Sequence, residues 1–149
     1  MTKKELAEKL FKSGYSCSQA VLCAFKDELG LDETTAVKMA SSFGGGMGRL
    51  RETCGAFSGL LLAAGLKYGP ENPRDVQAKT AHYALVQELA AKFKAQNGSV
   101  VCREILGLPG PQGPAPEPRT ETYYKKRPCA EIAGGAAEIL EELLKTRQK

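Results

Sequence analysis

The sequence predicts a single all-α domain over residues 1–149, folded as a compact bundle of six to seven helices. Three observations favour this fold class. Residues of high helix propensity, namely Ala, Leu, Glu and Lys, are plentiful along the whole chain. Residues that favour helix N-caps precede most segments in which apolar residues recur every three or four positions. The alternation of apolar and polar residues that is typical of a half-buried β-strand is missing from the sequence.

Capping signals set the expected helices of the first third of the chain. Thr2 and Ser16 each open a capping box, in which Glu or Gln follows three positions later. Asp32 is a further N-cap, and Gly14 and Gly30 are expected to end the first two helices. With Thr2, Ser16 and Asp32 as caps, the predicted helices span residues 3–12, 17–29 and 33–42.

Residues 43–59, FGGGMGRLRETCGAFSG, contain a glycine-rich loop at 44–48 and, six residues after it, Cys54. The glycines of this loop allow backbone angles that other residues avoid. Thr53 is expected to be an N-cap, with Cys54 as the first residue of the next helix. That position places Cys54 at the positive end of a helix dipole, with Arg49 and Arg51 nearby. Both effects stabilise thiolate over thiol and therefore favour sulfur chemistry at this site.

Helix starts are also recognisable in the second half of the chain. Asn72 followed by Pro73 is typical of an N-cap and a first helical residue, and Ser99 is expected to cap a short helix. Pro128 opens the last helix in the same way. The predicted helices of this half span residues 54–68, 73–96, 99–107 and 129–146.

Proline and glycine interrupt this half at two places. Residues 107–122 hold five of the eight prolines, which predicts an extended surface connection rather than a helix or a central strand. Gly134 and Gly135 lie inside the last predicted helix, where glycine costs about 1 kcal/mol relative to alanine. We therefore expect another backbone to approach closely at this pair.

Four of the five cysteines fall within the first turn of a predicted helix, whereas Cys23 lies mid-helix among apolar residues and is expected to pack in the core. Four converging helix N-termini would surround the sulfurs with positive dipole ends and free backbone N–H groups. Such surroundings suit thiolates, or the negatively charged metal–sulfur centre that thiolates bind. The four candidate ligands are Cys17, Cys54, Cys102 and Cys129.

The spacing of these cysteines leaves three kinds of site open. The sequence has no CxxC pair, which disfavours a zinc ribbon and thioredoxin-type exchange. The remaining hypotheses are an iron–sulfur centre that moves electrons, a metal-free thiol–disulfide or peroxide-reducing enzyme, and a structural zinc held by four cysteines. His82 is the only histidine and is expected to be a surface or packing residue, so the sequence favours no Cys–His nucleophile.

The composition of the chain limits which partners and which compartment are expected. The net charge of +4 is mild and the basic residues are interleaved with acidic ones, so no nucleic acid is expected as a partner. No apolar run is long enough for a membrane span and the N-terminus lacks a signal-peptide core, so we expect a cytoplasmic protein without a membrane partner. Small residues in segment 55–64 favour close helix packing and would permit a homodimer. The sequence identifies no redox partner protein.

A resemblance to a known family covers nearly the whole chain. Five motifs carry it, in the order in which the family has them: GYSCSQAV at 14–21, FGGGMG at 43–48, CGAFSG at 54–59, Cys102-Arg103 followed by Leu106-Gly107, and Cys129. With these motifs the chain resembles the C_GCAxxG_C_C family of redox-active proteins and the related C-terminal domain of split-Soret cytochromes c. The family's four cysteines correspond to the four candidate ligands, and Cys23 lies outside the pattern.

The resemblance implies a helical redox protein, and the split-Soret relative implies a 2Fe–2S cluster held by four cysteines. A 4Fe–4S cluster also takes four thiolates. The glycines expected beside the cofactor, where their N–H groups would donate to sulfur, are Gly44, Gly45, Gly46 and Gly55. No c-type haem is expected, because the chain has no CxxCH motif.

Overall fold

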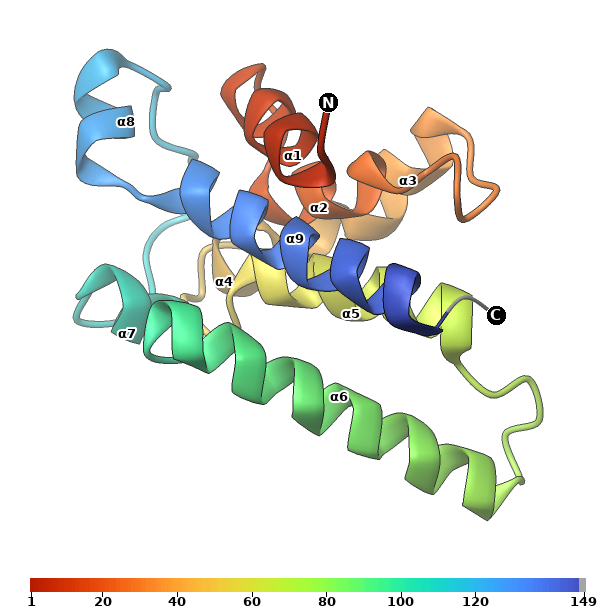
Figure 1. Ribbon diagram of the computed structural model, residues 1–149. Helices are drawn as coiled ribbons and strands as arrows, with labels where there is room; N and C mark the ends of the chain where they lie inside the picture. The colour runs from red at the N-terminus through yellow and green to blue at the C-terminus, as the bar shows by residue number, and fades with distance from the viewer. Residues whose placement is uncertain (148–149) are drawn as a thin grey trace.

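The computed structural model describes residues 1–147, and within them every regular element is helical, as the sequence predicts (Figure 1). Two short helices, α4 and α8, add to the predicted set. The helices are α1 (Lys3–Lys12), α2 (Cys17–Ala24), α3 (Glu33–Ala40), α4 (Gly44–Met47), α5 (Gly55–Tyr68), α6 (Val76–Asn97), α7 (Cys102–Leu106), α8 (Glu121–Lys126) and α9 (Cys129–Arg147), with a 3₁₀ turn, η1 (Ser41–Phe43), before α4.

Helices α2 and α9 form the centre of the bundle. Helix α2 packs against α1, α3, α5 and α9, and Ala20, Val21 and Leu22 on it are fully buried. Helix α9 crosses the middle of the molecule between α1 and α2 on one side and α6 on the other (Figure 1). Because both helices are rich in small residues, their neighbours can pack closely against them.

Helix α6 covers the outside of this centre and contacts α5 and α9 (Figure 1). It buries Leu85, Leu89 and Phe93, which lie four residues apart and so share one face. The ring of Phe93 lies 5.2 Å from that of Phe57 on α5, centroid to centroid. This apolar row fixes α6 on the bundle, while most of its other residues are exposed.

The predicted end of α2 and the predicted start of α6 are both wrong, for different reasons. Helix α2 ends at Ala24 rather than Leu29, and Phe25 caps it although its side chain is fully buried. The apolar pattern therefore continues past the helix and hides its end. Helix α6 begins at Val76 rather than Pro73, because the Asp75 side chain accepts a hydrogen bond from the Ala78 N–H at 3.0 Å.

The predicted non-helical segment 107–122 is shorter than expected. Its prolines all precede Thr120, whose side chain caps α8 by accepting from the Tyr123 N–H at 3.2 Å. Residues 121 and 122 are therefore helical, which corrects the prediction. We refer to residues 107–120, which contain no regular helix, as the proline-rich segment.

The close approach at the glycine pair of α9 involves side chains rather than another backbone, contrary to the sequence prediction. A methyl group at Gly134 would lie 2.6 Å from a carboxylate oxygen of Glu8, and one at Gly135 would lie 2.6 Å from the amide oxygen of Gln96. The pair thus accommodates polar side chains from α1 and α6. None of the helices in residues 1–147 combines the length and the apolar character needed to cross a membrane.

Candidate functional site

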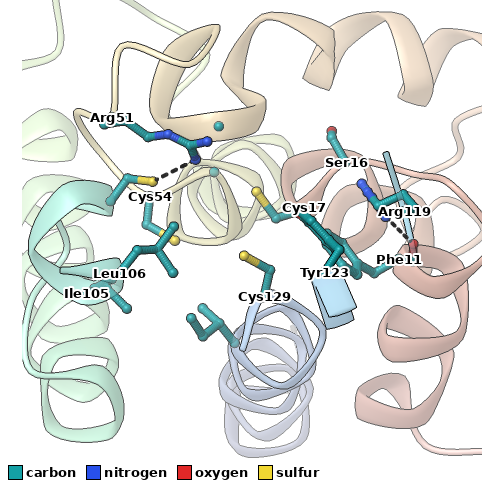
Figure 2. Close-up of a pocket in the computed structure, with 14 residues that line it drawn as sticks. Phe11, Ser16, Cys17, Arg51, Cys54, Ile105, Leu106, Arg119, Tyr123 and Cys129 are labelled. Atoms are coloured by element: carbon teal, nitrogen blue, oxygen red, sulfur yellow. Dashed lines mark hydrogen bonds between the residues drawn. The ribbon is translucent and has the colours of Figure 1, made fainter. Parts of the chain in front are cut away.

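The four cysteines selected from helix starts line one cavity. Its volume is about 70 Å³, and its walls come from α2, α5, α7 and α9 together with the glycine-rich loop and the proline-rich segment. In Figure 2, Cys17 and Cys129 lie near each other at the centre, with Cys54 to their left. Cys102 completes the set. Cys23 does not line this cavity and is buried in the core, as expected.

Each of the four sulfurs sits at the beginning of a helix. Cys17, Cys102 and Cys129 are the first residues of α2, α7 and α9. Cys54 is the N-cap of α5 and has an extended backbone, so the prediction that Thr53 caps this helix is wrong. Thr53 is instead paired with Val101 in an isolated β-bridge.

That β-bridge brings together the segments that precede Cys54 and Cys102, which are far apart in the sequence. The Cys54 N–H donates to the Val100 carbonyl at 2.7 Å, and the Cys102 N–H donates to the Glu52 carbonyl at 2.5 Å. Ser99 does not cap α7 as predicted, because its hydroxyl accepts from the Val101 N–H before the helix begins. These bonds fix the start of α7 against the start of α5.

The glycine-rich loop lies against the same sulfurs. Residues 45–49 all have positive φ, a conformation in which glycine carries no steric penalty but Met47 and Arg49 do. A Cβ at Gly46 would lie 2.7 Å from the Cβ of Cys102. A Cβ at Gly55 would overlap the sulfur of Cys17. Glycine at these positions therefore lets the backbone approach two of the cysteines closely.

Burial has the largest effect on the pKa of three of the cavity thiols. Loss of water raises the pKa of Cys17, Cys54 and Cys129, that of Cys129 to about 12. Backbone N–H groups, among them that of Gly45 beside Cys17, oppose this rise without cancelling it. At Cys54 the backbone N–H groups of Ala56 and Phe57 at the helix start favour the thiolate, as the sequence predicts, but burial outweighs them and the net effect is a raised pKa.

Arg51 brings a buried positive charge to the cavity. Its side chain is only 7% exposed, and its Nη1 donates to the sulfur of Cys102 at 3.6 Å, the dashed line from Arg51 in Figure 2. Its Nε and Nη2 both donate to the amide oxygen of Gln112, at 2.9 and 2.7 Å. The guanidinium therefore links a cavity sulfur to the proline-rich segment.

A carboxylate in the proline-rich segment gathers the surrounding cations. Glu117 accepts from Arg127 at 2.6 Å and lies within 4.0 Å of Lys126, Arg51 and Arg49. The hydrogen bond from Arg127 lowers the pKa of Glu117, and the neighbouring cations add to the effect. This network holds the proline-rich segment over the cavity.

Arg119 attaches the same segment to α1 and the turn after it. Its guanidinium donates to the carbonyls of Phe11 and Tyr15, at 2.8 and 3.1 Å. It also lies over the ring of Phe11, 4.1 Å from the centroid (Figure 2). The proline-rich segment is thus fastened on both sides of the cavity.

The chemistry available in the cavity is that of sulfur. Its lining contains no histidine, aspartate or glutamate, and His82 lies on α6 beside Tyr68 instead. In residues 1–147, no three Cys, His, Asp or Glu side chains are gathered closely enough to bind a single metal ion as they stand. A group bound by all four sulfurs would therefore have to occupy the shared space between them.

Sequence reasoning found the sulfurs and the arginines near them but missed Gln112, Glu117 and Arg119. These three residues lie in a segment whose composition indicated only an extended connection. Glu117 is the one acidic residue among these five prolines, and residues 49, 51, 126 and 127 are basic. This charge pattern is the signal that could have indicated Glu117.

One of three comparisons with known proteins gave a match. Residues 15–143 match the family described as "Putative redox-active protein (C_GCAxxG_C_C)". The searches of curated proteins and of solved structures gave no significant match. The family match covers all four cysteines of the cavity and most of the chain. The chain therefore belongs to the C_GCAxxG_C_C family of redox-active proteins.

Proposed function

We propose that this redox protein binds an iron–sulfur cluster through Cys17, Cys54, Cys102 and Cys129 and transfers electrons. One observation carries the proposal: four cysteines from four different helices line the same cavity, and the fifth does not. Cysteine thiolates are the usual ligands of 2Fe–2S and 4Fe–4S clusters. A bound cluster would accept and release single electrons.

The surroundings of the sulfurs fit such a group. Four helix starts and the N–H groups of the glycine-rich loop supply partial positive charge, and Arg51 adds a full charge beside Cys102. A cluster with its thiolates is an anion, so these groups would stabilise it and raise its reduction potential. Burial of Cys54 and Cys102 would shield it from water. We favour a 2Fe–2S cluster over 4Fe–4S because of the resemblance to split-Soret cytochromes, without haem.

The two alternative functions fit the cavity less well. A tetrahedral zinc site holds its sulfurs about 3.8 Å apart, given Zn–S bonds of about 2.3 Å. No three of these side chains are gathered around one ion, whereas a cluster spreads its ligands further. A metal-free dithiol enzyme needs a reactive thiolate, but burial raises the pKa of three of the four thiols. A bound metal would supply the positive charge that deprotonation requires.

Cysteine variants test the assignment directly. Iron, acid-labile sulfide and visible absorbance would be measured on protein purified without oxygen, for Cys54→Ser and for the matched control Cys23→Ala. We expect Cys54→Ser to lose the cluster or to hold it weakly, because a cavity sulfur is removed. Cys23→Ala should retain it, because that side chain lies in the core. Full retention of iron and sulfide by Cys54→Ser would contradict the proposal.

A further inference from the structure

A second cavity adjoins the one that holds the sulfurs. Its volume is about 270 Å³, and it lies between the glycine-rich loop and the proline-rich segment. The two cavities share part of their walls, so a molecule in the second would lie next to the sulfur site. The shared residues are Ser16, Gly45, Arg51, Arg119 and Tyr123.

The lining of this second cavity is strongly cationic. Arg49, Arg51 and Arg119 line it, and Glu117 is the one carboxylate among its lining residues. That carboxylate is already engaged by Arg127 at 2.6 Å. Lys126 lies 3.7 Å from it. The lining itself thus holds three positive charges and one negative charge, and the excess is positive.

Arg49 has hydrogen-bonding capacity that residues 1–147 do not use. Its Nε donates to the Gly113 carbonyl at 2.6 Å. Its Nη1 comes no closer than 4.0 Å to Glu117, beyond hydrogen-bond distance, although the side chain is only 17% exposed. A guanidinium has five N–H donors in a planar fork that matches the two oxygens of a carboxylate or phosphate. The terminal nitrogens of Arg49 are therefore placed to bind such a group.

The three arginines of the second cavity are not all explained by a need to neutralise the charge of the cavity sulfurs. Arg51 alone donates to a cavity sulfur, that of Cys102. Arg49 and Arg119 donate to backbone carbonyls of Gly113, Phe11 and Tyr15. Arg49 and Arg119 thus line the second cavity, and their hydrogen bonds go to backbone carbonyls rather than to a thiol.

We infer that the second cavity binds a small oxyanion, with a carboxylate or phosphate-type group held by the fork of Arg49 in the positive field of Arg51 and Arg119. The backbone of Gly44, Gly45 and Gly48 also lines the cavity, and the lack of side chains there leaves room for the ligand. Binding of the anion depends only on the arrangement of these arginines in the second cavity. That the anion lies beside an electron donor, and so could be a substrate, rests on the proposed function.

Calorimetric titration tests the site. Inorganic phosphate and, separately, malonate would be titrated into the full chain at constant ionic strength, with and without its metal. We expect saturable binding of one to one stoichiometry, and the tighter probe would identify the preferred oxyanion. Arg49→Gln should weaken binding by about tenfold or more, because a charge-assisted hydrogen-bond pair is lost. Lys125→Gln makes the same charge change at an exposed residue outside the cavity and should leave the affinity unchanged.

Two results would overturn the inference: absence of saturable binding for both probes, or equal weakening by Arg49→Gln and Lys125→Gln, which would indicate only a general effect of charge. If Arg49→Gln does not fold, Arg49→Lys keeps the charge without the fork and should still bind more weakly; unchanged affinity would contradict the site. A colourless, metal-free protein that binds the anion would refute the cluster and leave this inference standing.

Discussion

At the scale of single residues, glycine and cysteine are matched in pairs around the cavity. Gly46 faces Cys102 and Gly55 faces Cys17, and in both places a Cβ would collide with the cysteine side chain. The glycine-rich loop is therefore needed both for its positive φ angles and for its lack of side chains. The first reason is visible in the sequence, whereas the second requires the folded structure.

Two alanine substitutions separate these two reasons. Gly46 and Gly48 have similar φ values, 70° and 62°, but a Cβ at Gly48 meets nothing within 4 Å. Gly48→Ala should therefore cost only the left-handed backbone penalty of about 1 kcal/mol. Gly46→Ala should cost that plus the clash with Cys102 and with the backbone of Arg51 and Glu52, about 3 kcal/mol in total. Urea unfolding would compare the two variants, and equal losses would show that the contact with Cys102 is unimportant.

At the scale of elements, the proline-rich segment is held in place by charge. Glu117 is its main anchor, because it connects the segment to the glycine-rich loop through Arg49 and Arg51 and to the start of α9 through Arg127. Arg127 is buried, so the loss of its partner would leave a buried charge unpaired. The position of the proline-rich segment is therefore set by the ion pairs of Glu117 rather than by the backbone preferences of its own residues.

Glu117→Gln tests this anchor. We expect the free energy of unfolding to fall by about 2 kcal/mol at pH 7, and amide exchange to quicken in residues 107–120. Glu121→Gln, an exposed position in the first turn of α8, is the matched control and should change both measurements little. If exchange in residues 107–120 is the same in both variants, the anchoring role is wrong.

The same carboxylate predicts a pH dependence. The pKa of Glu117 is lowered in the fold from its ordinary value of 4.5, so the folded state binds this proton more weakly than the unfolded chain does. The stabilisation is fully present above pH 4.5 and is lost as the pH falls through the folded pKa. The stability difference between the native chain and Glu117→Gln should therefore shrink in acid. A difference that is constant between pH 7 and pH 3 would contradict the assignment.

At the scale of the whole molecule, the sequence predicted the helical fold and the cavity cysteines from local signals. Capping residues and the four cysteine positions are local, and α1 and α9 begin where predicted. The helix boundaries that were predicted wrongly depend on tertiary contacts. Phe25 is buried beyond the end of α2, and Thr53 pairs with Val101, which shifts the start of α5. Likewise, Glu117 gains its role only from cations that the fold brings to it.

The central claim is that the cavity between α2, α5, α7 and α9 holds an iron–sulfur cluster. The most direct measurement is the visible absorption spectrum of the native chain purified without oxygen, with iron, zinc and acid-labile sulfide assayed on the same sample. We predict a brown protein with iron and sulfide in equal amounts, near two of each per chain for a 2Fe–2S cluster. A colourless protein with stoichiometric zinc, or one that stays metal-free after reconstitution with iron and sulfide, would contradict it.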